Sequence, residues 1–520
     1  MKKLKTIFEN GPLFPIIFTV SLIITSCGGT FERDNSQLIR QKSAGKIIPK
    51  NSSEISSSPF GIQAGTMEDS LLVKAAQIGV KWTRLLAGWE GIEKEKGVFS
   101  WEETDEAINA VLKYGITPFV TITNGNRLYS GTGNYDDPKL AAIYGESPSP
   151  PVGSQEETDA WLNFVGAVIE RYKDKIVYWE IWNEPNHQKY WGAPPNAVDY
   201  GRLVQVTAEK IRSIHPEAKI IAGSTAGLDP LYNDTFLNQC DPENLDIISF
   251  HQYDPLPENR AFAIDVFLEV LDKHNPDFEI WQGECGFPST SRTTGYRARA
   301  PWGLNIQAKW LLRQSIVDTY YCRATLSNYF LLAHYGTMTP ELNRPELSGM
   351  DLIFGYPERD GSRVHFDGVN EKCILFRDNY KPKPAFYAYQ NLCAVWAQEY
   401  KPHTVEYDVK VVDQGAFYGI GEYEDAFPSV PLVATYSAEN GNNLLAWWLP
   451  WNMQEYLPEL ATVTISLEGI NFTDPVMLDP LSGEVYEIQI KNSDKGCVFD
   501  EVVLADYPFI VVERETINFN

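Results

Sequence analysis

Short apolar segments alternate with amphipathic segments between residues 59 and 397. The apolar segments have the length and composition of buried strands, and the segments between them, such as 101–112, place apolar residues at helical spacing. Eight such strands, separated by helices, predict a closed parallel (β/α)8 barrel, the TIM barrel, in which reactive side chains collect at the carboxyl ends of the strands. The predicted strands are Phe60–Ala64, Trp82–Leu86, Thr117–Ile122, Val177–Trp182, Lys219–Ala222, Ile247–His251, Glu279–Gln282 and Thr325–Leu331.

The pattern changes to short alternating strands in residues 398–520. Leu444–Trp448, Thr462–Leu467, Val485–Ile490 and Phe509–Val512 are apolar segments separated by turns rich in Gly, Asn, Asp and Pro. This spacing predicts a C-terminal β-sandwich domain. Packing against the barrel and binding of carbohydrate are both open as its role.

The amino terminus has the pattern of an export signal. Lys2, Lys3 and Lys5 precede an apolar run, 13–24, that is shorter than the roughly 20 residues of a membrane-spanning helix. The run ends in Ile-Thr-Ser-Cys27, which resembles the lipobox of bacterial lipoproteins. We therefore expect residues 1–27 to be a lipoprotein-type signal, with lipidation of Cys27, and 28–58 to be a flexible tether. An ordinary secretory signal is the alternative.

Charge and composition exclude several classes of protein. The chain has 520 residues and a net charge of −25, which would repel a nucleic-acid backbone. Its membrane contact is expected to be the lipid anchor alone. The seven cysteines and seven histidines show no zinc-ligand spacing, so no metal site is predicted, and we expect the cysteines beyond Cys27 to be buried free thiols.

Two glutamates follow strands that lie in one barrel. Glu184 is the sixth residue of the segment Trp-Glu-Ile-Trp-Asn-Glu-Pro at 179–185, and Glu284 ends Glu-Ile-Trp-Gln-Gly-Glu at 279–284. Strands four and seven would therefore raise both carboxylates into one cleft. Paired carboxylates are what cleavage of a glycosidic bond requires, and their separation decides between retention and inversion. That chemistry needs no cofactor.

These motifs resemble clan A glycoside hydrolases, in which Asn-Glu follows strand four and a Glu follows strand seven. The resemblance implies that Glu184 is the acid/base, Glu284 the nucleophile of a retaining reaction, and Asn183 a ligand of the sugar 2-hydroxyl. It also implies that Arg84 lies near the nucleophile and keeps it ionised. The segment Ser-Phe-His-Gln-Tyr at 249–253 resembles the clan's His-x-Tyr segment.

From that segment the resemblance implies that Tyr253 contacts the nucleophile and that His251 lines the sugar pocket. Within the clan, the residues after Glu184, including Tyr190 and Trp191, and the segment 381–389 look most like glycoside hydrolase family 39. A β-sandwich after the barrel is also typical of that family.

Other polar and aromatic residues have structural explanations beside the functional ones. Glu180 shares the interior face with Glu184 and is expected to be an ion-pair partner, whereas Glu279 starts its strand and is expected to be structural. Cys285 is expected to pack in the core, and Asn124 is either a turn residue or a sugar ligand. Indoles in active-face loops either stack on a sugar or pack in the core. These are Trp89, Trp191 and Trp302, and of them we place Trp191 and Trp302 in the site. Arg297 and Arg299 either bind the carboxylate of a uronic acid or are solvated.

The sequence therefore predicts an exported, lipid-anchored, retaining β-glycosidase that acts on β-glycans or their oligosaccharides. Two alternatives stay open: an endo-acting glucanase, xylanase or mannanase, and a surface glycan-binding lipoprotein without catalysis. Carbohydrate is the expected partner in all three cases.

Overall fold

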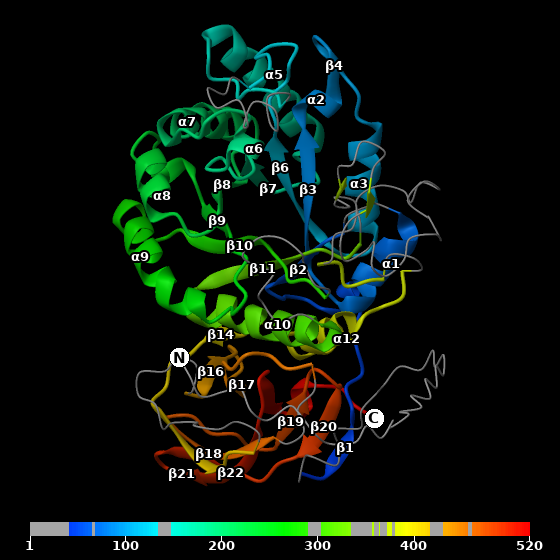
Figure 1. The fold of residues 1–520 in the computed structure, drawn as a ribbon, viewed down its shortest axis with the longest axis vertical. Coiled ribbons are helices and arrows are strands. Elements are labelled where there is room, and N and C mark those ends of the chain that lie inside the picture. The colour runs from blue at the N-terminus through cyan, green and yellow to red at the C-terminus, as the bar shows by residue number, and fades with distance from the viewer. Residues whose placement is uncertain are drawn as a thin grey trace, which may run out of the picture.

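The computed structural model contains a barrel and a sheet domain, with the barrel above and the sheets below (Figure 1). It describes residues 41–64, 68–133, 147–289, 303–333, 356–357, 363–364, 372–376, 380–415, 430–455 and 460–520. Helices α10 (Leu304–Ile316) and α12 (Pro384–Val395) lie between the two parts (Figure 1).

Eight parallel strands close the barrel, which confirms the predicted fold. In barrel order they are β10 (Glu279–Cys285), β11 (Ala324–Phe330), β2 (Phe60–Gln63), β3 (Trp82–Gly88), β6 (Thr117–Thr123), β7 (Tyr178–Ile181), β8 (Lys219–Ala226) and β9 (Ile247–His251). Among the described residues, the other α-helices of this part are α1 (Asp69–Ile78), α2 (Trp89–Ile92), α3 (Glu102–Lys113), α5 (Gln155–Tyr172), α6 (Gln188–Trp191), α7 (Ala197–Ile214), α8 (Pro230–Leu237) and α9 (Asn259–His274). A π-helical turn, η5 (Val317–Tyr321), follows α10.

Aromatic rings fill the amino end of the barrel. The Trp281 ring lies 5.3 Å from that of Phe119, and 5.4 Å from those of Trp82 and Tyr178. These four residues lie in the first half of their strands, and together with Leu326 and other apolar residues they form a separate buried cluster. Because this cluster closes one end, the polar interior residues are concentrated toward the carboxyl end.

Two antiparallel sheets form the second part, in agreement with the predicted sandwich. One contains β1 (Ser43–Lys46), β20 (Glu484–Glu487), β19 (Pro475–Asp479), β23 (Phe509–Glu513), β17 (Asn443–Trp448), β16 (Leu432–Ser437) and β14 (Lys401–Pro402), in that order. The other contains β15 (Tyr407–Asp413), β18 (Ala461–Glu468), β22 (Gly496–Leu504) and β21 (Lys491–Ser493). Strand β18 alternates buried and half-buried residues, as expected of a strand with one face on a core.

The expected flexible tether ends earlier than its composition indicates. Strand β1 lies inside the range 28–58 and pairs with β20 at the edge of the seven-stranded sheet. Ile47 and Ile55 are 6% and 2% exposed, and Ile47 pairs with Phe519 near the other end of the chain. The sequence pattern missed this segment because its few apolar residues are isolated among Ser, Lys and Asn, and only their partners from distant segments bury them.

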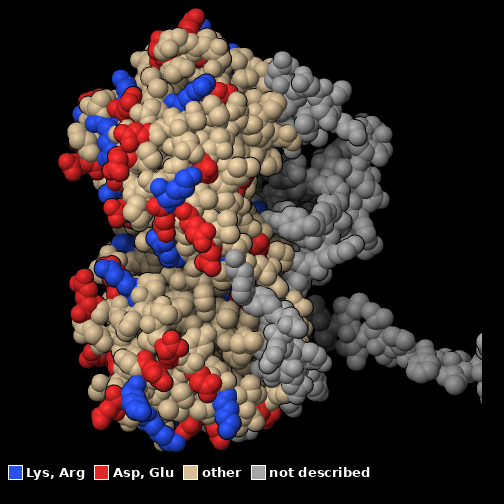
Figure 2. All heavy atoms as spheres, turned by 90° about the vertical axis from the view of Figure 1, so that its left-hand side faces the viewer, with Lys and Arg blue, Asp and Glu red and all other residues tan. Residues whose placement is uncertain are grey.

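Charged side chains of both signs are interspersed on the face shown in Figure 2. This face therefore shows no basic stripe of the kind that follows a nucleic-acid backbone. Within the described ranges, no helix is both long enough and apolar enough to cross a bilayer.

Ile47→Ser is expected to lower the free energy of unfolding by about 2 kcal/mol, because a buried isoleucine contributes roughly that amount. Its neighbour Ile48 is 40% exposed, so Ile48→Ser is the matched control and should change stability by less than about 0.5 kcal/mol. Urea unfolding of the two variants measures both effects. Equal stability of the two variants would show that this segment is a tether after all.

Candidate active site

Glu184 lies just beyond β7, where the backbone bends sharply. Trp182 and Glu184 have φ of 70° and 44°, in the left-handed region that side-chain-bearing residues rarely adopt. The Glu184 N–H donates to the Ser224 carbonyl over 3.0 Å, which ties the bend to the neighbouring strand β8. The bend turns the carboxylate into the barrel, where Glu184 is 9% exposed.

Glu284 is the penultimate residue of β10. Arg84 Nη1 donates to its Oε2 over 3.1 Å, and the Tyr253 hydroxyl donates to its Oε1. Gly283, directly before it, leaves space for this arrangement, because a Cβ there would lie 2.4 Å from Ser249 Oγ. The nucleophile expected from the sequence is therefore held by one donor within β3 and one just after β9.

The two catalytic candidates lie close together. One carboxylate oxygen from each of Glu184 and Glu284, and a ring nitrogen of His251, all lie within 4.8 Å of one another. Retaining glycosidases place their carboxyl groups about 5–5.5 Å apart, whereas inverting enzymes need about 6.5–9.5 Å to admit a water. The observed spacing fits the retaining geometry.

Arg84 joins Glu284 to a second, deeper carboxylate. Its Nε donates to Glu180 Oε2 over 2.7 Å, and its side chain is 1% exposed. Ser224 and Thr121 also donate to Glu180. Burial opposes ionisation of Glu180, but the Arg84 charge and these hydrogen bonds hold its pKa below the usual value. Glu180 is thus the interior ion-pair partner expected from its position.

His251 contacts the acid/base candidate. Its Nδ1 lies 3.1 Å from Glu184 Oε1, and its side chain is fully buried. Burial raises the pKa of Glu184, but the hydrogen bond and charge of His251, with smaller contributions from His187 and Arg84, bring it below the usual value. His251 therefore favours the ionised form of Glu184.

Tyr253 stays neutral beside Glu284. Burial, followed by the neighbouring Glu284 charge, raises the pKa of Tyr253 well above its usual value. Its hydroxyl is consequently a proton donor to Glu284. The ammonium of Lys372 lies 4.8 Å from the centre of the Tyr253 ring.

The buried polar atoms that have no hydrogen-bond partner among the described residues include three close to the two glutamates. They are Asn183 Oδ1, Ser249 Oγ and His251 Nε2. Unpaired buried polar atoms are costly and are therefore rare outside sites that bind a ligand. Asn183 is the residue expected to contact a sugar hydroxyl, and its free acceptor agrees with such a contact.

The structure corrects the placement of Trp191. Its side chain is 1% exposed and packs between the rings of Trp182, at 5.2 Å, and Tyr200, at 6.0 Å. It therefore has no face to offer a sugar and supports the bend that carries Glu184. Trp89 is also in the core, where its Nε1 donates to Glu93. Trp302, Arg297, Arg299 and Cys27 lie outside the described residues.

The remaining candidates have structural positions. Cys285 is buried and its thiol donates to the Asn328 carbonyl over 3.6 Å. Glu279 is exposed at the start of β10, where it accepts from Thr325. Asn124 is exposed with φ of 68°, as in a turn. Among the described residues the cysteines are free thiols.

Sequence reasoning missed Ser249 and Lys372. Ser249 is two residues before His251 on β9, so period-two alternation could have placed both on the interior face. Lys372 comes from a long connection between β11 and α12, far from any motif, and no local signal marks it. Only the folded chain brings it over Tyr253.

Glu184, His251 and Glu284 also have the spacing of a possible metal site. However, Glu284 is already paired with the Arg84 cation, and Glu184 with His251. A nearby fixed guanidinium repels a metal ion and satisfies the charge that would attract it. The donor set therefore suits acid/base chemistry better than metal binding.

Comparison with known proteins finds similarity to glycoside hydrolases. Residues 76–274 match the family described as Glycosyl hydrolases family 39. The chain is 24% identical over 226 residues to a β-xylosidase from Geobacillus stearothermophilus, covering 40% of this chain and 43% of that protein. It is 31% identical over 119 residues to the aryl-phospho-β-D-glucosidase BglA of Bacillus subtilis, covering 22% of each chain. The matched segments thus span less than half of these relatives.

Solved structures share the fold over most of the chain. A family 39 glycoside hydrolase from Bacteroides cellulosilyticus aligns with a TM-score of 0.60 at 16% identity, over 90% of this chain and 83% of that one. A monomeric β-xylosidase from Caulobacter crescentus aligns with a TM-score of 0.52 at 14% identity, over 90% and 97%. The chain is thus similar to family 39 glycoside hydrolases over residues 76–274, and it shares the fold of the solved structures over most of its length.

Proposed function

We propose that this protein is a retaining β-glycosidase. The observation that carries the proposal is the distance of at most 4.8 Å between carboxylate oxygens of Glu184 and Glu284 at one end of the barrel. The curated relatives support a β-linked substrate, because their names are those of a β-xylosidase and of phospho-β-glucosidases. A β-xyloside is accordingly the first substrate to test.

In the first step of the proposed reaction, Glu284 attacks the anomeric carbon and the bond to the leaving oxygen breaks. Glu184 gives its proton to that oxygen, so the leaving group departs as a neutral alcohol. As Glu284 becomes an ester its charge disappears, and the Tyr253 hydroxyl and Arg84 then face the glycosyl-enzyme. In the second step Glu184 takes a proton from water, which attacks the anomeric carbon and releases Glu284.

The polar contacts indicate which glutamate is the nucleophile and which is the acid/base. Glu284 receives one hydrogen bond from a cation and one from a neutral hydroxyl, which stabilise its ionised form as a nucleophile. Glu184 has no arginine within bonding distance among the described residues and exchanges its proton next to His251. The ion-paired Glu284 is therefore assigned as the nucleophile, and Glu184 as the group that exchanges a proton in each step.

The proposal is tested by hydrolysis of aryl β-glycosides and β-linked polysaccharides, with xylosides first, using a chain that begins at or before residue 41. Glu284→Gln is expected to abolish turnover because the amide cannot form the glycosyl ester. Glu184→Gln should slow natural glycosides by about 10²–10⁴-fold and spare aryl glycosides with good leaving groups in the first step.

Product size then separates the alternatives. Release of a single monosaccharide identifies an exo-acting glycosidase, and mixed oligosaccharides identify an endo-acting one. Glycan binding without turnover by the wild-type protein, unchanged by Glu284→Gln, would refute the enzyme and favour a binding protein.

His251→Asn is expected to raise the pKa of Glu184, because the asparagine cannot carry the charge that favours the Glu184 carboxylate, and burial then dominates. Glu184 must be protonated in the first step, so its ionisation sets the alkaline limb of kcat/KM. That limb should move to higher pH in the variant. Profiles of kcat/KM against pH for both proteins measure the shift. An alkaline limb that stays in place or moves to lower pH contradicts this effect of His251 on Glu184.

We also propose that the protein is exported and anchored in a bacterial membrane through lipid on Cys27. The support is the basic amino terminus, the short apolar run 13–24 and the small residues around Cys27. Expressed in a bacterial host, the full chain should fractionate with membranes, and Cys27→Ser should move it to the soluble fraction. Cys240→Ser, at a free cysteine of the barrel, is the control and should stay with membranes. A soluble wild-type protein would favour an ordinary secretory signal.

A further inference from the structure

The loop between β9 and α9 carries the tyrosine that contacts Glu284. It comprises residues 252–258, with Tyr253 near its start and Glu258 at its end, where α9 begins. The Tyr253 hydroxyl can donate its hydrogen bond to Glu284 only while this loop keeps its position. The contacts that hold the loop therefore determine whether the proposed nucleophile receives this hydrogen bond.

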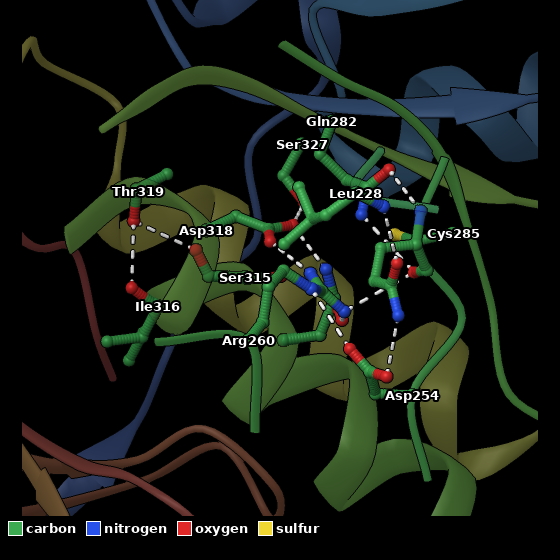
Figure 3. A network of polar contacts seen from close by, with 12 residues as sticks. Leu228, Asp254, Arg260, Gln282, Cys285, Ser315, Ile316, Asp318, Thr319 and Ser327 are labelled. Atoms are coloured by element: carbon green, nitrogen blue, oxygen red, sulfur yellow. Dashed lines mark hydrogen bonds and ion pairs between the residues drawn. The ribbon is translucent and has the colours of Figure 1, made fainter. Parts of the chain in front are cut away.

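The barrel anchors the start of the loop through Arg260. This fully buried side chain donates to the Gln252 carbonyl over 3.3 Å and to Asp254 Oδ2 over 3.3 Å, on either side of Tyr253. It also forms an ion pair with Asp318 of η5 and donates to Gln314 Oε1 of α10 over 2.9 Å. Figure 3 shows Arg260 between Asp254 and Asp318.

The second domain reaches the end of the loop at Glu258. The Glu258 carboxylate is fully buried and is paired with Arg313 of α10, whose Nε lies 2.7 Å from its Oε1. Trp448 of β17 also donates to this Oε1, from its indole Nε1 over 2.7 Å. One carboxylate of the catalytic loop is thus held by a barrel cation and a sandwich N–H group.

The two donors do different work. Arg313 neutralises the buried charge of Glu258. Without this cation, the buried carboxylate would strongly destabilise the fold. The neutral N–H of Trp448 adds direction, because it fixes the carboxylate relative to the seven-stranded sheet. Joining the two domains does not depend on this bond, since Lys309 of α10 and Asp506 of the sandwich already form a buried ion pair of 2.8 Å.

We propose that the β-sandwich is a positioning element for the active site: Trp448 fixes Glu258, and Glu258 fixes the loop that presents Tyr253 to Glu284. Glu258 and Trp448 are positioning residues that act through Tyr253. The role of Tyr253 in turnover rests on the proposed function.

Trp448→Phe tests this coupling, because it removes the N–H group and keeps an aromatic ring. Kinetics are measured with the aryl β-glycoside that the wild-type protein hydrolyses. The variant is expected to lower kcat by about fivefold, with KM changed by less than about twofold. In a Tyr253→Phe background the same substitution should change kcat by less than about 1.5-fold, since the group through which it acts is gone.

Trp447→Phe is the matched control. Trp447 is the neighbouring residue of β17, is equally buried, and donates its indole N–H to the Val503 carbonyl over 2.7 Å inside the sandwich. It should cost comparable stability in thermal unfolding and leave kcat unchanged. Equal loss of kcat in both tryptophan variants, or the same loss from Trp448→Phe with and without Tyr253, would overturn the proposal.

Crystal structures of the wild-type and Trp448→Phe proteins decide the positional claim without relying on turnover. The distance from the Tyr253 hydroxyl to the Glu284 carboxylate should increase in the variant. An unchanged distance overturns the inference even if the enzyme is active. A wild-type protein with no hydrolysis of any substrate instead refutes the proposed function, while the measured displacement still decides whether the sandwich positions the tyrosine.

Discussion

The buried guanidinium of Arg84 is the interaction on which the site depends. It lies between Glu180 and Glu284, which come from strands on different sides of the barrel, and its side chain is 1% exposed. A buried cation is stable only when paired, and two carboxylates so close to the Glu184 carboxylate would repel one another without it. Arg84 therefore both permits the cluster of acids and fixes the direction of Glu284.

The barrel provides the conditions for that ion pair. Packed aromatic rings around Trp281 close its amino end, so that polar side chains gather at the carboxyl end. Left-handed backbone then bends the chain just after β7, at Trp182 and Glu184, and within the neighbouring strand β8, at Ser224. Such conformations are costly and persist where tertiary contacts impose them. Here the core packing of Trp182 against Trp191 stabilises the bend.

The second domain is part of the same folded unit and not an appended module. Buried polar contacts join it to the barrel at Lys309 and Glu258, and β1, from the far end of the sequence, completes its larger sheet. Because buried charges must keep their partners, the two domains cannot separate without large cost. Through these contacts a displacement in the sandwich reaches the loop 252–258.

The sequence by itself determined the barrel, the sandwich and the strand-end glutamates, because hydrophobic periodicity and the Asn-Glu-Pro turn are local signals. It also placed Glu180 in the interior, by period-two alternation. Tertiary structure alone decided that Trp191 is buried, that β1 belongs to the sandwich, and that Glu258 links Trp448 to the active-site loop. Each of these features depends on a partner that is far away in the sequence. A residue is buried only when such a partner packs against it, so its own sequence neighbourhood does not reveal the burial.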